Sequence, residues 1–202
     1  MARGFPSVGF ERYCDDVVVH CRSERQARHV LGEIIEQLAH CKLEVNEAKT
    51  RIVYCKDDKR RGPHSPQWFD FLGYTFRARS CKGKRGIFTS FNPAISERAR
   101  KKIGQEIRDW KLQLWSGHTL NDIARCINVV VQGWVNYYGR YFRSELSPLL
   151  RRINFYLVRW AQRKYKRLRD SSARAWRLLT RVARREPGLF AHWRSGARPL
   201  AG

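Results

Sequence analysis

Two adjacent aspartates, Asp15 and Asp16, are the residues of this chain best suited to metal chemistry. They lie in the stretch FERYCDDVVVHC, residues 10–21. Side chains alternate between the two faces of a strand, so neighbouring carboxylates in one continuous strand could not hold the same ion. The β-prone runs on either side predict a hairpin with both aspartates at its turn. Because Asp is also common in turns for structural reasons, the pair alone leaves a catalytic and a structural interpretation open.

A helix and further strands are predicted behind this hairpin. Ser23, followed three residues later by Gln26, forms a capping box, and apolar residues at helical spacing then predict a helix over residues 24–41. Three more β-prone runs predict strands at residues 51–55, 67–79 and 85–92. In the second run we expect Trp68 and Phe69 to be core residues. These elements predict an antiparallel sheet with a helix, in an α+β arrangement.

The character of the sequence changes after Asn92 and Pro93. Apolar residues then recur at helical spacing, which predicts a bundle of helices. The first carries Ala99 through Leu114, Thr119 caps the second, Leu146 to Trp160 form the third, and the fourth spans residues 172–185. We expect Trp110, Trp134 and Trp160 to lie in its core. Residues 194–202 are expected to be frayed.

The charge balance indicates a polyanionic partner. The chain has 202 residues, 43% of them hydrophobic, and its 41 Lys and Arg outnumber 18 Asp and Glu, giving a formal net charge of +23. This excess is far larger than solubility requires. An anionic membrane is the competing partner, but the longest apolar run, CINVVVQGWV, is too short and too polar to span one. We therefore expect nucleic acid, no membrane and, without a secretory signal, a cytoplasmic protein.

The basic residues concentrate in the helical half, and almost no acid lies between Arg151 and Arg169. A solvated helix face usually mixes both signs of charge, so this face is predicted to bind RNA. The predicted RNA-binding residues are Lys101, Lys102, Arg108, Arg152, Arg159, Arg163, Lys164 and Arg167. The six cysteines form no C-x-x-C pair, so we expect reduced thiols and no structural zinc.

Several stretches occur together in a specific order. YCDD at residues 13–16, LEVNEAKT at 43–50 and FLGY at 71–74 precede the basic helices, which contain WVNYYGRYF at 134–142 and end with EPGLFAHW at 186–193. In these motifs the chain resembles the C-terminal half of a group II intron reverse transcriptase and maturase. The resemblance implies the end of a reverse transcriptase palm at residues 1–92, a maturase-specific or thumb domain at 93–170, and a basic C-terminal helix and tail at 171–202.

The resemblance also implies roles for individual residues. Asp15 and Asp16 match the catalytic aspartates that bind Mg²⁺, and Lys49 matches a lysine near the nucleotide triphosphate, although a solvated surface lysine is the alternative for it. The primer grip corresponds to Phe71, Leu72, Gly73 and Tyr74. The implied activity is RNA-directed DNA polymerisation with assistance to splicing, and the implied partners are group II intron RNA and primer and template nucleic acid.

One departure from the family limits the expected activity. Another metal-binding aspartate, together with the fingers, belongs upstream of the residues that match here. Two carboxylates without that partner would hold Mg²⁺ weakly, since the ion demands a fixed octahedral set of ligands. We therefore expect RNA binding without polymerisation from this chain alone, unless an N-terminal half complements it. The alternatives are a split or degenerate splicing factor in which both aspartates are relics, and a broken reading frame without function.

Overall fold

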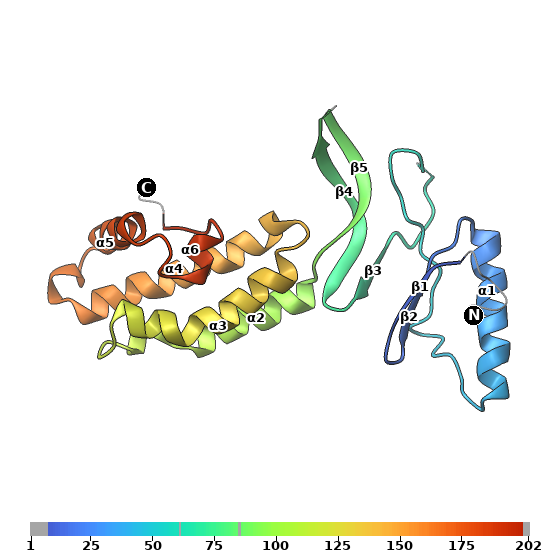
Figure 1. Ribbon diagram of the computed structural model, residues 1–202, viewed down its shortest axis with the longest axis horizontal. Helices are drawn as coiled ribbons and strands as arrows, with labels where there is room; N and C mark the ends of the chain where they lie inside the picture. The colour runs from blue at the N-terminus through green and yellow to red at the C-terminus, as the bar shows by residue number, and fades with distance from the viewer. Residues whose placement is uncertain (1–7, 61, 85, 200–202) are drawn as a thin grey trace. The chain divides into compact units, whose positions relative to one another are not determined.

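The computed structural model describes residues 8–60, 62–84 and 86–199, and these form two compact units (Figure 1). The first unit contains the chain up to residue 71 together with residues 77–91. The second, which we call the helical unit, contains residues 72–76 and the chain from residue 92 onward. The division between residues 91 and 92 lies beside the change in sequence character. Predictions for residues 1–7 and 200–202 lie outside the described residues.

The first unit begins with the predicted hairpin and helix. Strands β1 (Phe10–Tyr13) and β2 (Asp16–Val19) pair antiparallel, with Tyr13 opposite Asp16. Helix α1 (Glu24–His40) follows, and its first turn is capped by the Ser23 hydroxyl, which accepts a hydrogen bond of 3.2 Å from the Gln26 N–H. The cap and the periodic apolar residues predicted this helix correctly to within one residue.

The later strands differ from the prediction. Residues 51–55 form no strand, although the Tyr54 N–H donates to the Pro66 carbonyl at 2.8 Å. Residues 67–79 are not one strand but two, joined by a tight turn at Leu72 and Gly73. The sheet contains β3 (Trp68–Phe71), β4 (Tyr74–Gly83) and β5 (Gly86–Ile95), in the order β3-β4-β5. Trp68 is 48% exposed, so its expected place in the core was wrong.

The helical unit is a bundle that contains the predicted helices, one of which begins at the predicted cap, Thr119. Its helices are α2 (Glu97–Asp109), α3 (Leu120–Tyr138), α4 (Arg143–Lys164), α5 (Ser172–Arg185) and the short α6 (Ala191–Arg194). Thr119 and Asp122 form a reciprocal capping box at the start of α3. Helix α2 ends earlier than predicted, because Lys111 adopts a left-handed conformation and leads into a short 3₁₀ turn that contains Leu114.

Helix α4 runs through the middle of the bundle core and contacts α2, α3 and α5. Trp160 is almost completely buried on it, whereas Trp110 and Trp134 are partly buried and stack on each other with their centroids 5.4 Å apart. The tail is not frayed as predicted over residues 195–199, because Ala197 is buried and its carbonyl accepts a hydrogen bond from Asn154. The small sheets and the helical bundle confirm the α+β fold class.

Candidate catalytic hairpin and nucleic-acid interface

The β1–β2 hairpin presents two carboxylates at its tip. Because Tyr13 pairs with Asp16, the turn consists of Cys14 and Asp15, and Asp16 is the first residue of β2. Cys14 has a positive φ of 52°, which lets a two-residue turn match the twist of the strands. Both aspartates are exposed, and within residues 8–60, 62–84 and 86–199 neither forms an ion pair. Asp15 therefore lies in the turn and Asp16 in β2, so the two carboxylates are not neighbours within one continuous strand.

The chemistry of this pair suits a hard divalent cation, but the pair is a partial ligand set. Carboxylate oxygens are the ligands that Mg²⁺ prefers, and the ion usually keeps several waters and binds substrate phosphates. Among the described residues no group of three His, Cys, Asp or Glu side chains could hold a metal. Asp15 and Asp16 therefore fit Mg²⁺ only together with ligands from substrate, water or another segment.

Lys49 lies in a short turn rather than on a regular element. Its N–H is 3.1 Å from both the carbonyl and the side-chain oxygen of Asn46, an arrangement in which Asn stabilises the turn. The lysine side chain is exposed. In the described part of the chain no hydrogen bond or ion pair joins it to Asp15 or Asp16, so its role near the triphosphate stays a prediction.

The predicted primer-grip residues include a tight turn that is held by tyrosines of the helical unit. Leu72 and Gly73 both have positive φ, at 48° and 76°, as a two-residue turn of this type requires. Tyr137 donates its hydroxyl to the Leu72 carbonyl at 2.8 Å, and the Ser96 N–H donates to the Gly73 carbonyl at 2.9 Å. A Cβ atom at Gly73 would lie only 2.9 Å from the Tyr138 hydroxyl. Glycine at position 73 thus avoids both the steric cost of a positive φ and the close approach to Tyr138.

Tyr74 anchors this turn in what we call the tyrosine cluster, formed by Tyr74, Tyr137, Tyr138 and Tyr141. The three other rings lie 5.3–5.6 Å from the Tyr74 ring, and its hydroxyl donates to the Tyr137 carbonyl. Burial, with smaller contributions from the neighbouring tyrosines, raises the pKa of Tyr74 to about 12. Its hydroxyl therefore stays protonated and can act as this donor. The sequence motif WVNYYGRYF contained three of these tyrosines, but nothing local indicated that they would hold residues 72–74.

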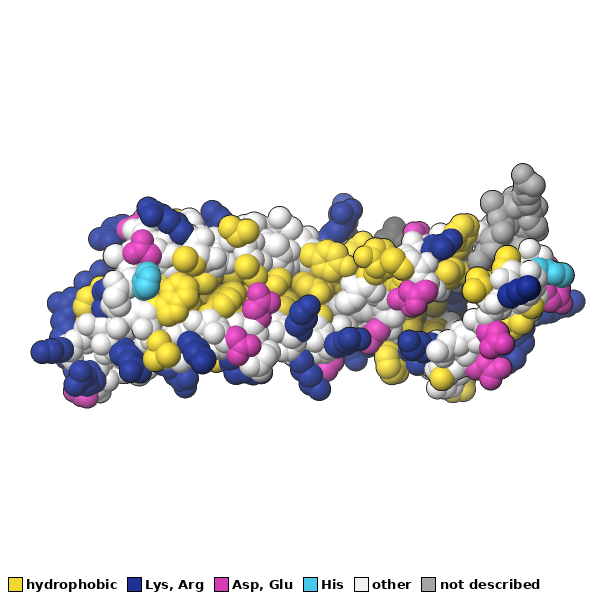
Figure 2. Space-filling model, turned by 90° about the horizontal axis from the view of Figure 1, so that it is seen from below, with side chains coloured by type: hydrophobic (Ala, Val, Ile, Leu, Met, Phe, Trp, Pro, Cys, Tyr) yellow, Lys and Arg dark blue, Asp and Glu magenta, His cyan; other side chains and the backbone are white. Residues whose placement is uncertain are grey.

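Most of the predicted RNA-binding residues lie on exposed faces of α2 and α4 and in the turn that follows α4. Lys101, Lys102 and Arg108 are exposed on α2, Arg152, Arg159 and Arg163 on α4, and Arg167 in the turn. Figure 2 shows dark-blue Lys and Arg side chains around the left-hand end of the helical unit. The structure thus leaves these side chains accessible to a ligand.

Lys164 differs from the other predicted RNA-binding residues. Its ammonium group donates to the carbonyls of Ser116 and His118, each at 2.9 Å, and lies 5.6 Å from the centre of the Trp160 ring. These contacts tie the end of α4 to the loop that precedes α3. The structure therefore gives Lys164 a stabilising role, which its position in a basic run did not indicate.

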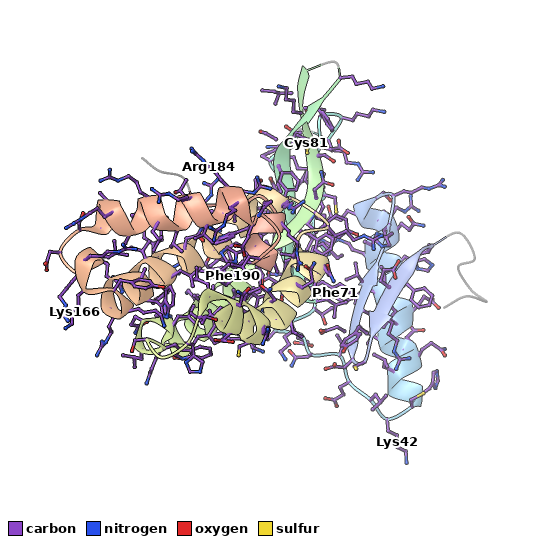
Figure 3. The ribbon with its side chains drawn as sticks, turned by 60° about the vertical axis from the view of Figure 1, so that its left-hand side comes forward. Lys42, Phe71, Cys81, Lys166, Arg184 and Phe190 are labelled. Atoms are coloured by element: carbon purple, nitrogen blue, oxygen red, sulfur yellow. The ribbon has the colours of Figure 1, made fainter. Side chains whose placement is uncertain are left out.

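Helix α5 adds a second arginine-rich surface that the residue-level prediction omitted. All of its charged side chains are arginines, and all are exposed: Arg174, Arg177, Arg181, Arg184 and Arg185. In Figure 3, Arg184 points away from the bundle, whereas Phe190 lies among the helices. The arginine density of residues 172–185 was the available signal for this surface. Because α5 packs on α4, its arginines lie on a helix next to the basic residues of α4.

A buried polar cluster fastens the C-terminal segment to the bundle. The side-chain oxygen of Asn154 accepts a hydrogen bond from Trp193 Nε1 at 2.8 Å and contacts His192 Nε2 at 2.9 Å. Asn128 similarly joins α3 to the Leu189 carbonyl and the Ala191 N–H. His192 is fully buried, and this burial lowers its pKa to about 3. The motif EPGLFAHW therefore stabilises the packing of the C-terminal segment on α3 and α4.

Comparison with known protein families assigns both parts of the chain. Residues 2–76 match the reverse transcriptase (RNA-dependent DNA polymerase) family, whose members use divalent metal ions, and residues 100–181 match the group II intron maturase-specific domain. Among curated proteins no match is found. No helix in the described part of the chain is long and apolar enough to cross a membrane. With a reverse transcriptase segment followed by a maturase-specific domain, the chain belongs to the group II intron reverse transcriptase and maturase family.

Proposed function

We propose that the helical unit binds group II intron RNA through the exposed basic face of α2, α4 and α5, and that this binding assists splicing. The observation that carries the proposal is the sign of the charges on α4 and α5. The exposed charged side chains of both helices are all basic. The one acid on α4, Glu145, is half-buried and paired with Arg100 at 3.3 Å. Such a face favours a polyanion over a protein of mixed charge.

Arginine is well suited to this task. Each guanidinium can donate two parallel hydrogen bonds to a phosphate, and neutralising phosphates releases condensed counterions from the RNA. The deep, narrow major groove of an RNA helix prevents side chains from reading its bases, so contacts of this kind recognise the shape of the folded RNA. Rigid helices that hold arginines at fixed spacing can therefore select a structured intron over an unfolded RNA of the same length.

For the first unit, we propose that Asp15 and Asp16 bind Mg²⁺ together with substrate phosphates. When bound, the ion would polarise the phosphate and favour attack by the primer hydroxyl. The short, hydrogen-bonded hairpin would present both negatively charged carboxylates to the ion. Separately, in the helical unit, the turn at Leu72 and Gly73 would contact the primer, and its anchoring by Tyr74 and Tyr137 supports a rigid role. Polymerisation requires further ligands beside these two carboxylates, as the partial ligand set indicates.

The RNA-binding proposal is tested with two matched double variants. Arg159→Gln with Arg163→Gln removes two charges from the basic face of α4, and Arg125→Gln with Arg140→Gln removes two exposed charges elsewhere in the helical unit. Each protein is titrated with a structured group II intron RNA and an equally long unstructured RNA over a series of salt concentrations. The wild type should prefer the intron RNA at every salt concentration.

We expect the α4 variant to bind the intron RNA more weakly and to reduce the slope of log affinity against log salt. Each lost phosphate contact removes about 0.9 from that slope on a duplex. The Arg125 and Arg140 variant should retain the wild-type slope. Equal effects of both variants would show that only net charge matters, and equal affinity of the wild type for both RNAs would contradict recognition of the intron.

A further inference from the structure

An exposed phenylalanine lies in the middle of the basic face of α4. Phe155 is 56% exposed, and its ring meets the ring of Trp176 on α5 edge-to-face, with centroids 5.1 Å apart and planes at 86°. Phe155 lies outside the buried core, to which α4 contributes residues such as Ile153 and Leu157, whereas Trp176 is half-buried and packs against that core. Trp176 contacts the Phe155 ring from one side, and the exposed part of the ring is accessible to a ligand.

The neighbours of Phe155 are arginines. Residues three and four positions apart lie on the same face of a helix, so Arg151, Arg152 and Arg159 surround Phe155 within about 6 Å along the helix axis on either side. All three are exposed, and the guanidinium of Arg159 lies 5.8 Å from the centre of the Tyr156 ring, on the same helix. On α5, the residue after Trp176 is the exposed Arg177. No acidic side chain occurs between residues 151 and 163 of α4.

Single exposed hydrophobic side chains are common and need no function. Phe155 differs because its exposed aromatic ring packs on a second ring and is surrounded by positive charge. A second copy of this face would bring like charges together, which disfavours self-association. An apolar protein partner would have to desolvate the arginines. A nucleotide satisfies both components at once, since its base stacks on the ring while its phosphates meet the guanidinium groups.

We propose that Phe155, supported by Trp176, is a stacking platform for an unpaired base of the bound RNA, with Arg151 and Arg159 contacting the phosphates on either side. This inference rests on the proposed RNA-binding function and adds a base-contacting site to it. The base must be unpaired, because bases within a duplex are stacked on each other and present no free face. A loop, bulge or single-stranded junction of a folded RNA is therefore the expected ligand.

The test compares three variants of the full chain. Phe155→Leu keeps an apolar side chain but removes the aromatic face, Phe155→Trp retains such a face, and Phe10→Leu removes a similarly exposed ring that lies next to an acid, Glu11. The probes are a short single-stranded RNA with 2-aminopurine at its centre and a blunt RNA duplex with the same number of phosphates. Affinity, salt dependence and 2-aminopurine fluorescence are measured for each pair.

We expect Phe155→Leu to weaken single-strand binding by about 5- to 150-fold, the equivalent of about 1–3 kcal/mol for one stacked base. Its duplex affinity and its salt slope should stay unchanged, because no charge is removed. Quenching of 2-aminopurine should occur with the wild type and Phe155→Trp but be lost with Phe155→Leu, while Phe10→Leu behaves as the wild type.

The proposal is overturned if Phe155→Leu leaves single-strand affinity unchanged or lowers single-strand and duplex affinity equally. The RNA-binding function itself fails under a different result, in which the wild type binds neither RNA with a salt-dependent affinity. If the wild type binds both RNAs and the Arg159 and Arg163 variant loses affinity for both, the RNA-binding role of the basic face is supported. The Phe155 variants alone then decide whether a base stacks there.

Discussion

Burial of His192 makes the stability of the helical unit depend on pH. Its Nε2 atom lies 2.9 Å from the Asn154 side-chain oxygen, which also accepts from Trp193, so Nε2 carries the proton of the neutral ring. In the described part of the chain, Nδ1 is buried without a hydrogen-bond partner. A second proton would have to reside on Nδ1, where no acceptor from the described part of the chain stabilises the charge. This is the physical reason for the low pKa of His192, about 3.

The magnitude follows from the difference between the folded and unfolded pKa values. The unfolded histidine has a pKa of 6.5 and the folded one about 3, so below pH 6.5 the unfolded chain binds more protons. The stability contribution is complete above pH 6.5 and is lost as the pH falls from there toward 3. At about 1.4 kcal/mol per pKa unit, lowering the pH from 7 to 5 should cost about 2 kcal/mol.

Urea unfolding at pH 7, 6 and 5, followed by far-UV ellipticity, measures this loss. His192→Phe removes the titrating group, and although it also destabilises the protein by breaking the contact with Asn154, its free energy of unfolding should change by about 2 kcal/mol less over this range. His118→Gln is the matched control, because His118 is exposed, and it should keep the full pH dependence. A pH dependence as large in His192→Phe as in the wild type would refute the reasoning.

Three further predictions concern the turn, the loop contact and the hairpin. Gly73→Ala should destabilise the helical unit by about 1–3 kcal/mol, because of its positive φ and the approach of Tyr138, and Tyr138→Phe should relieve part of this cost in a double-mutant cycle of urea unfolding. Gly196→Ala, with a positive φ but open space, should show no such coupling. Lys164→Met should lower the free energy of unfolding by about 1–3 kcal/mol, because two loop carbonyls lose their hydrogen-bond donor. An unchanged unfolding midpoint would contradict that role. Asp15→Ala should abolish primer extension in a preparation that also contains the fingers and first palm strands, without changing RNA affinity; undiminished extension would exclude the metal role.

Much of the helical architecture could be predicted from the sequence because its signals are local. Ser23, Thr119 and the apolar residues three and four positions apart mark helix starts and buried faces within a few residues of each other. The hairpin at Asp15 was also predicted, since β-prone runs on both sides of a turn leave few alternatives. The charge excess likewise indicated a polyanion without any knowledge of the fold.

Contacts between distant residues could not be predicted in this way. The stretch around Leu72 and Gly73 has the composition of one strand, and its turn is held by Tyr137 and Ser96, which are 65 and 23 residues away. For Lys164, the carbonyls that it binds lie more than forty residues earlier in the chain.

The sequence by itself determined the helices, the acidic hairpin, the basic charge and the family motifs, because each depends on neighbouring residues or on composition. Only the tertiary structure decided which basic side chains are exposed, since the Lys164 ammonium group binds two loop carbonyls whereas the arginines of α5 face solvent. It also decided that Phe155 is exposed against Trp176 and that His192 is buried. Both outcomes depend on how α4 packs against α5 and the C-terminal segment, and no local pattern specifies that packing.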